Sequence, residues 1–162
     1  MSFDDRTFRK ALGCFSTGVT VVTTLTPEGL PVGVTVNSFS SLSLQPPLVM
    51  FCLDSKNSFL DAFKARGHFV VNVLRHEQRE LSIRFASRVQ DRWKDIVFNS
   101  ATNGAPVLPG CLAHFECSAI DIREGGDHVI FIGRVDSLEH SEAGQPLIYY
   151  RGAYAELGCV VP

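Results

Sequence analysis

Two short segments of the sequence bring together side chains that could bind a ligand. The first spans residues 35–41 (TVNSFSS) and is rich in small hydroxyl and amide side chains. At the end of a strand, such side chains and the backbone amides present donors and acceptors in one plane, as the O2, O4 and N3 edge of a flavin ring requires. The same pattern is typical of the polar outer face of an edge strand, and on chemistry alone that ordinary interpretation is favoured.

The second segment spans residues 54–58 (DSKNS), at the expected start of a helix. Exposed N–H groups at a helix start, together with hydroxyl groups and one lysine, favour a phosphate. Serine and asparagine are also the preferred helix N-caps, so a plain cap explains the segment equally well. The two interpretations are compatible, because a cap residue can hold both the helix and a phosphate.

A histidine and three tyrosines are the other candidates. His128 follows a Gly-Gly-Asp turn, where a lone histidine is usually a solvated loop residue. Tyr149, Tyr150 and Tyr154 lie within six residues, and aromatic side chains there more often pack the end of a barrel than form a stacking platform.

Several common catalytic motifs are absent from the sequence. It contains no G-x-G-x-x-G after a predicted strand, no P-loop and no G-x-S-x-G. The five histidines show no metal-ligand spacing, so no metal is expected. A hydrolytic triad is not favoured, because no nucleophile lies on a recognisable sharp turn.

Composition predicts one globular domain over residues 1–162. Hydrophobic residues make up 45% and charged residues 20%, and the net charge is −2. The arginines between residues 75 and 92 alternate with acidic residues, which predicts a solvated helix face and no nucleic-acid partner. No apolar run reaches the roughly 20 residues of a membrane span. The acidic start at residues 1–5 is no signal peptide, so we expect a cytoplasmic protein without membrane association.

The five cysteines are odd in number and irregularly spaced, and the sequence contains no C-x-x-C. Zinc-binding and thioredoxin-like interpretations are therefore weak. Most of these cysteines have apolar neighbours, so the simplest expectation is buried free thiols in a reducing cytosol.

Strands outnumber helices in the predicted order of elements. Helices are expected over residues 3–14 (with Ser2 and Asp5 as its cap), 58–66 (with Ser58 and Asp61 as its cap) and 76–88. Strands are expected over residues 19–25, 33–39, 48–53, 68–74, 111–123, 128–138 and 147–150. Because most neighbouring strands are joined by hairpin-like turns, the pattern predicts an antiparallel barrel with a few helices packed outside.

Four motifs in order resemble one known family, the short-chain flavin reductases. They lie at residues 17–23 (TGVTVVT) with 35–39 (TVNSF), at 41–49 (SLSLQPPLV), at 126–135 (GDHVIFIGRV) and at 146–154 (PLIYYRGAY). The resemblance covers residues 8–157. These reductases are components of two-component flavin-dependent monooxygenases.

The resemblance implies a mostly β, Greek-key-like FMN-binding split barrel with a few peripheral helices. It implies a homodimer that transfers hydride from NADH or NADPH to FMN or FAD and supplies reduced flavin to a separate oxygenase. Carried over by position, cofactor contacts fall on Thr35, Val36, Asn37, Ser38, Ser41, Asp54, Ser55, Lys56, Asn57, Ser58, Ala86, Ser87, His128 and Tyr150.

Those contacts have different roles in the resemblance. Residues 35–38 and Ser41 would face the isoalloxazine ring, and residues 55–58, 86 and 87 would line the phosphate. His128 would position the nicotinamide, with possible help from Tyr150. Because the cofactors carry the redox chemistry, no side chain is obligatory as a catalytic nucleophile or base.

Two other functions fit a similar barrel. A non-catalytic flavin- or haem-binding protein would share the ring pocket without a nicotinamide pocket, and the Gly-Asp-His motif at residues 126–128 argues against it. An oxidase of a phosphorylated vitamin would require a more basic substrate pocket than the sequence offers.

Overall fold

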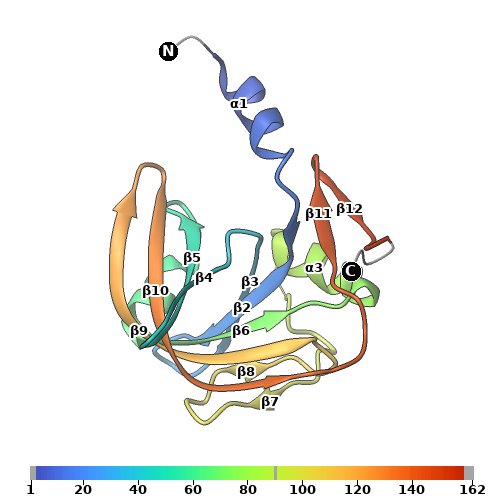
Figure 1. The fold of residues 1–162 in the computed structure, drawn as a ribbon. Helices are drawn as coiled ribbons and strands as arrows, with labels where there is room; N and C mark the ends of the chain where they lie inside the picture. The colour runs from blue at the N-terminus through green and yellow to red at the C-terminus, as the bar shows by residue number, and fades with distance from the viewer. Residues whose placement is uncertain (1–2, 90, 159–162) are drawn as a thin grey trace.

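The computed structural model describes residues 3–89 and 91–158, and it is mostly antiparallel β-structure (Figure 1). The helical elements are α1 (Asp5–Leu12), α2 (Leu60–Arg66), the 3-10 turn η1 (His76–Gln78) and α3 (Arg79–Ala86). The first strands are β1 (Thr17–Gly18), β2 (Thr20–Leu25), β3 (Pro31–Val36), β4 (Ser40–Leu44), β5 (Pro47–Asp54) and β6 (His68–Val73). The later strands are β7 (Asn99–Ser100), β8 (Pro106–Val107), β9 (Ala113–Gly125), β10 (His128–His140), β11 (Ile148–Tyr150) and β12 (Ala153–Ala155).

Seven strands form the main sheet in the order β3-β2-β6-β9-β10-β5-β4. The sheet curls, so that β4 and β5 rise opposite β2 and β3 (Figure 1). Two smaller sheets, β1-β11-β12 and β7-β8, complete the strands. The sheets do not close into one ring, and this split-barrel-like arrangement confirms the expected mostly β, antiparallel class with peripheral helices.

An aromatic cluster fills the curl of the main sheet. Phe51 on β5 stacks on Phe131 of β10, with 5.0 Å between ring centroids, and meets Phe69 of β6 edge-on at the same distance. Phe63 from α2 packs against both Phe51 and Phe131. All four side chains are buried, so burying apolar surface holds the curled sheet and α2 together.

A buried polar residue ties the main sheet to the segment that carries β8. The Asn72 amide on β6 donates to the Val21 carbonyl at 2.9 Å and to Thr23 Oγ1 at 3.2 Å. Its oxygen accepts from the Leu108 N–H at 2.8 Å and lies 3.1 Å from His114 Nδ1. Burial lowers the pKa of His114 despite two nearby acidic groups. The Asn72 amide therefore supplies hydrogen bonds to the Val21 carbonyl and the Leu108 N–H in a buried region that water does not reach.

The long strands agree with the predictions, but short ones were missed. All seven predicted strands are present with shifted ends, and the second ends at Val36, before the predicted residue 39. The sequence analysis did not identify β1, β4, β7, β8 or β12. The strand β4 is serine-rich and forms an edge of the sheet, so it lacks the apolar alternation of a strand with one buried face.

The helix ends differ from those predicted. The N-cap of α1 is Asp4, whose side chain accepts from the Thr7 N–H, while Ser2 lies outside the described residues. The predicted Ser58 and Asp61 cap of the second helix is wrong, because α2 begins at Leu60 after Phe59, which makes no side-chain cap bond. The predicted helix over residues 76–88 is split into η1 and α3.

The cysteines confirm the expectation only in part. Cys111 and Cys117 are buried thiols, and burial raises their pKa to about 11 and about 12. Cys52 is half-buried, but Cys14 is exposed, contrary to the prediction. Cys159 lies outside the described residues.

Within residues 3–89 and 91–158, no helix is long and apolar enough to cross a membrane.

Candidate functional site

Strand pairing brings the segment of residues 54–58 beside His128. In the register of β5 and β10, Asp54 lies opposite His128. The Ser55 N–H donates to the Asp127 carbonyl at 2.9 Å, which fixes the segment to the β9–β10 turn. Two regions that the sequence singled out separately therefore form one corner of the molecule.

Three amides of this segment, those of Ser55, Lys56 and Asn57, are already hydrogen-bonded, contrary to the prediction that they are available at a helix start. The Lys56 N–H donates to the Asp54 carboxylate at 2.7 Å, and the Asn57 N–H donates to the Asp54 carbonyl at 2.9 Å. The Asn57 side chain accepts from the Phe59 N–H at 2.9 Å. Side chains must therefore provide most of any anion binding at this corner.

A cavity of about 810 Å³ opens at the corner. It lies against Asp54, Lys56, Asn57, Ser58, Phe59, Ala86, Arg88, Val89 and Arg92. Lys56, Arg88 and Arg92 outnumber the single carboxylate of Asp54, so the cavity favours an anion.

Arg92 is a fixed part of this cavity. Its Nη1 donates to the carbonyls of Phe85 at 3.2 Å and Gly33 at 3.3 Å, and its guanidinium carbon lies 4.9 Å from the Phe59 ring centroid. Burial lowers the pKa of Arg92. The buried Nε has no hydrogen-bond partner among the described residues, so this cation retains an unused donor.

A second cavity of about 200 Å³ meets the first at Ala86. Its lining comprises Val19, Thr35, Asn37, Ser82, Ala86, Tyr149 and Tyr154. The Tyr149 and Tyr154 rings meet edge-on, with 5.5 Å between centroids. Ser82 Oγ lies 2.8 Å from the Tyr154 hydroxyl, so α3 fixes this tyrosine in place.

Several predicted hydroxyl groups are used within the protein. Thr35 Oγ1 donates to the Ser82 carbonyl at 2.7 Å. Ser38 Oγ donates to the Cys52 carbonyl at 3.1 Å and accepts from its N–H at 2.9 Å. Ser87 Oγ donates to the Arg84 carbonyl at 2.8 Å at the end of α3. These hydroxyls chiefly stabilise the backbone around the cavities, and a ligand could bind only to their remaining lone pairs.

The other residues of segment 35–41 differ in exposure. Val36 is buried and its carbonyl accepts from Thr20 Oγ1, so this residue belongs to the core. Asn37 and Ser41 are exposed, and Asn37 lines the smaller cavity. Asn37 is thus the polar side chain of this segment best placed to contact a ligand.

His128 and Tyr150 lie near the two cavities rather than on their described linings. His128 is half-buried, and its Nδ1 lies 2.7 Å from the Asp127 carboxylate. This hydrogen bond is the main reason that the pKa of Asp127 is lowered. Tyr150 is exposed, with the Arg151 guanidinium 5.2 Å from its ring centroid.

Ser82, Tyr149 and Tyr154 line the smaller cavity but are not among the predicted site residues. The one sequence signal for the tyrosines is that the chain's three tyrosines lie between residues 149 and 154, a concentration that is also typical of packing at a barrel end. Ser82 gave no signal, because a serine within a helix is ordinary. In the described part of the chain, no group of three or more His, Cys, Asp or Glu side chains could hold a metal.

Comparison with known proteins places this arrangement among flavin enzymes. Residues 12–158 match the sequence profile described as "Flavin reductase like domain". The reductase subunit HsaB of a flavin-dependent monooxygenase from Rhodococcus jostii is 44% identical over 94% of this chain and 78% of its own length. The FMN reductase (NADH) SmoA of Agrobacterium fabrum is 45% identical over 93% of this chain and 85% of its own.

A solved structure shows the same fold. The NADH:FAD oxidoreductase SgcE6 of Streptomyces globisporus, in complex with NAD and FAD fragments, superposes with a TM-score of 0.89 and 35% identity. The match covers 95% of this chain and 93% of that one.

Proposed function

This chain belongs to the flavin reductase family, and from that premise we propose that its two adjoining cavities hold a flavin that accepts hydride from NADH. The chain is a flavin reductase, with FMN or FAD as flavin. The observation that carries the site assignment is that the cationic and aromatic cavities meet at Ala86. A phosphate and a planar ring joined by a short chain require such a pair of neighbouring spaces.

The residues present fit such a cofactor. Lys56, Arg88 and Arg92 supply positive charge for a phosphate. Asn57 and Ser58 line the same space, and Ser55 is the neighbour of Lys56 in the chain. Tyr149 and Tyr154 offer aromatic surface in the smaller cavity, and Asn37 offers both donors and an acceptor at its rim.

The protein's part in the reaction is mainly to hold and orient. The flavin, when bound, supplies the hydride-accepting ring. Asn37, on the lining of the smaller cavity, would bind the polar edge of that ring, and Arg92 with Lys56 would hold the phosphate. Holding two rings in contact replaces a bimolecular encounter by a bound arrangement, which is a large part of the rate enhancement. His128, oriented by Asp127, is a positioning residue for the nicotinamide.

Replacing His128 by alanine is expected to raise the KM for NADH about tenfold and to leave the Kd for flavin within about twofold. The side chain lies beside Asp54 but does not line the described phosphate cavity, so flavin contacts should survive its loss. Steady-state kinetics and flavin titration measure the two effects. If flavin binding collapses while the KM for NADH stays constant, His128 has been assigned to the wrong ligand.

The names of the relatives also support a partner. HsaB is a monooxygenase reductase subunit, and we propose that this chain likewise delivers reduced flavin to a separate oxygenase. In a coupled assay, the oxygenase should form product only when this reductase, flavin and NADH are all present. Product formed when the flavin is omitted would contradict the proposal that reduced flavin is delivered to the oxygenase. That residues 1–162 form one domain and work in the cytoplasm stays a prediction.

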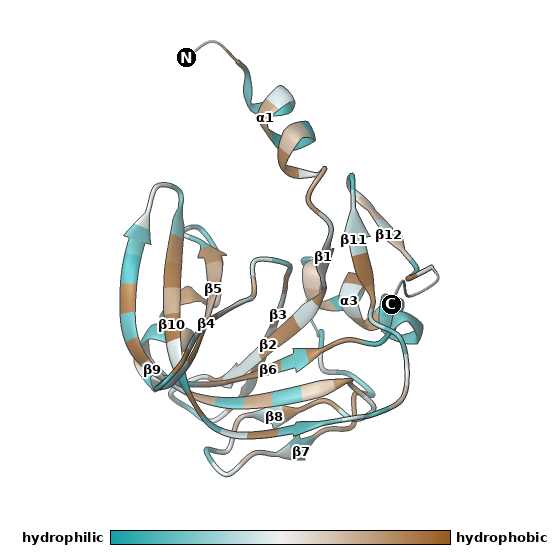
Figure 2. Cartoon of the chain, viewed as in Figure 1, coloured by the Kyte–Doolittle hydropathy of each residue, from teal (hydrophilic) through white to brown (hydrophobic). Residues whose placement is uncertain are grey.

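We further propose that the chain forms a homodimer through α1. No residue of α1 is buried, and Phe8, Leu12 and Phe15 are 50%, 57% and 78% exposed. In Figures 1 and 2, α1 stands clear of the sheets with its apolar segments uncovered. A second copy would remove this surface from water. Sedimentation equilibrium should give twice the 17.8 kDa mass of one chain, and a monomer at micromolar concentration would contradict the proposal.

An NADH oxidation assay with FMN, FAD and riboflavin tests the proposed function. We expect rapid oxidation with FMN or FAD and weaker binding of riboflavin by about tenfold or more, because riboflavin lacks the phosphate that the cationic cavity holds. Protein that binds flavin without accelerating NADH oxidation would instead be a flavin carrier. Equal affinity for riboflavin and FMN would contradict the proposal that the cationic cavity holds the flavin phosphate.

A further inference from the structure

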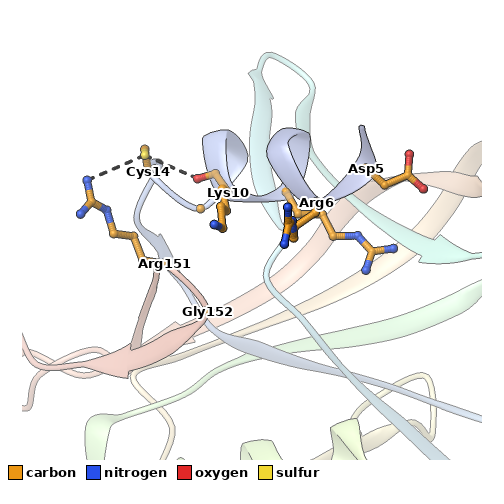
Figure 3. A pocket seen from close by; sticks show the side chains of 8 residues that line it. Asp5, Arg6, Lys10, Cys14, Arg151 and Gly152 are labelled. Atoms are coloured by element: carbon orange, nitrogen blue, oxygen red, sulfur yellow. Dashed lines mark hydrogen bonds between the residues drawn. The ribbon is translucent and has the colours of Figure 1, made fainter. Parts of the chain in front are cut away.

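A third cavity lies away from those assigned to the flavin, between α1 and the turn that follows β11. Its volume is about 790 Å³. The lining consists of Asp5, Arg6, Arg9, Lys10, Gly13, Cys14, Arg151 and Gly152. Figure 3 shows Arg6 and Lys10 from α1 and Arg151 from the turn around this hollow. None of these residues lines the two cavities described above.

The cavity is strongly positive on a protein whose net charge is −2. The lining contains one carboxylate, that of Asp5, and four cationic side chains, those of Arg6, Arg9, Lys10 and Arg151. Arg151 contacts Cys14 Sγ and the Tyr150 ring, but among the described residues none of the four cations is neutralised by a carboxylate in an ion pair. Such a group of like charges favours an anion from outside, and arginine binds phosphate oxygens through paired N–H groups.

The cavity is built by a specific junction. The Arg151 N–H donates to the Gly13 carbonyl at 2.8 Å, and Arg151 has a positive φ of 50°. A side-chain carbon on Gly13 would lie 3.2 Å from the Arg151 Cα, so glycine permits this close approach. The junction sets the base of α1 on the β11–β12 turn. The cationic residues then face the turn, while Phe8 and Leu12 lie on another face of the helix.

The charge of Arg9 on α1 also acts on Asp127, at the corner where Asp54 lies opposite His128 and where the nicotinamide is proposed to bind. The pKa of Asp127 is lowered mainly by the hydrogen bond with His128, and the charge of Arg9 lowers it further. Arg9 is therefore electrostatically close to the residue that orients His128. A ligand held at that corner could extend a second anionic group toward α1.

We propose that this cationic cavity of α1 and Arg151 binds the diphosphate of NADH. The inference rests on the proposed function, and it adds a second anion site beyond the phosphate cavity at Lys56 and Arg92. NADH carries a diphosphate, whereas reduced nicotinamide mononucleotide carries one phosphate, so the cavity favours NADH over its mononucleotide form. The diphosphate of FAD includes the phosphate proposed to bind at Lys56 and Arg92, so it does not extend to this separate cavity.

The test uses the full chain with Arg6→Gln and Arg9→Gln combined. Neither residue is buried, and glutamine is a good helix former, so the fold should be retained. With FMN as acceptor, the KM for NADH is measured against that for reduced nicotinamide mononucleotide. With NADH saturating, the KM for FAD is measured against that for FMN. We expect about a tenfold loss of the preference for NADH over its mononucleotide and no change in the preference for FAD over FMN.

A matched control is Arg66→Gln, which removes an exposed arginine from the last turn of α2. It should change neither preference. Raising the ionic strength should also weaken dinucleotide binding in the parent protein more than in the double variant. The proposal is overturned if the preference for NADH over its mononucleotide is unchanged, or if only the preference for FAD over FMN is lost. Because activity with FMN and the mononucleotide tests the flavin reductase function itself, failure of the two proposals can be distinguished.

Discussion

Replacing Ala86 by phenylalanine is expected to lower kcat/KM for flavin about a hundredfold or more. Ala86 is the residue that the linings of the cationic and aromatic cavities share, so a bulky side chain there takes up space in both. A flavin would then have to give up either its phosphate contacts or its ring contacts. Titration with FMN, followed by flavin fluorescence, should show the loss of affinity directly, and stopped-flow reduction by NADH should show the loss of rate.

The size of the side chain, not a change of fold, should cause this loss. Ala86 is exposed at the end of α3, so phenylalanine there meets no core atoms. Ala86→Ser is the conservative comparison and should retain activity within a few-fold. Ala65→Phe makes the same replacement at an exposed position of α2 outside both cavities. If Ala65→Phe and Ala86→Phe lower activity equally, the two cavities do not form a joint flavin site.

The long strands were predictable because their sequences carry the pattern that burial imposes. The continuous apolar run of residues 48–53 predicts β5 as a strand covered on both faces. The strand is present, but its buried residues alternate with partly exposed ones. Short strands such as β7 and β8 hold two residues each, which is too few for a pattern to appear. The helix ends were less predictable because a cap depends on one hydrogen bond, and at α2 the expected bond of Ser58 is not made.

The site was predictable in part for a similar reason. Segment 54–58 and His128 were both chosen, but no local pattern shows that Asp54 lies opposite His128, since pairing across a sheet depends on the whole topology. The hydroxyls of Thr35 and Ser38 were chosen as ligand contacts from their type. Their bonds to Ser82 and Cys52 join residues distant in the sequence, so residue type alone could not separate a ligand contact from a structural bond.

For the N-terminal helix, the pattern correctly predicted an amphipathic helix, but the apolar face that it indicates is not buried. The spacing of Phe8 and Leu12 predicted an amphipathic helix, and α1 has that form. Its apolar face nevertheless remains exposed in the single chain. A hydrophobic pattern indicates which face avoids water, but it does not indicate whether the covering surface comes from the same chain or from another.

The largest loss of stability is expected from Asn72→Ala, at about 3 kcal/mol in the free energy of unfolding. The change removes two hydrogen bonds that the amide donates, to the Val21 carbonyl and Thr23 Oγ1, and one that it accepts from the Leu108 N–H. Asn72 is fully buried, so water cannot easily replace these bonds. Urea unfolding followed by circular dichroism measures the loss.

A control and a second variant separate this network from a general effect of truncation. Asn99→Ala removes the same amide from an exposed position of β7 and should change the free energy of unfolding by no more than about 0.5 kcal/mol. Asn72→Asp retains the oxygen facing Leu108 but loses both donated bonds and buries an ionisable group, so it should destabilise at least as much as alanine at pH 7. If Asn72→Ala costs no more than Asn99→Ala, the amide does not hold β8 to the sheet. In that case the apolar contacts of Leu108, which is itself fully buried, must hold the segment without it.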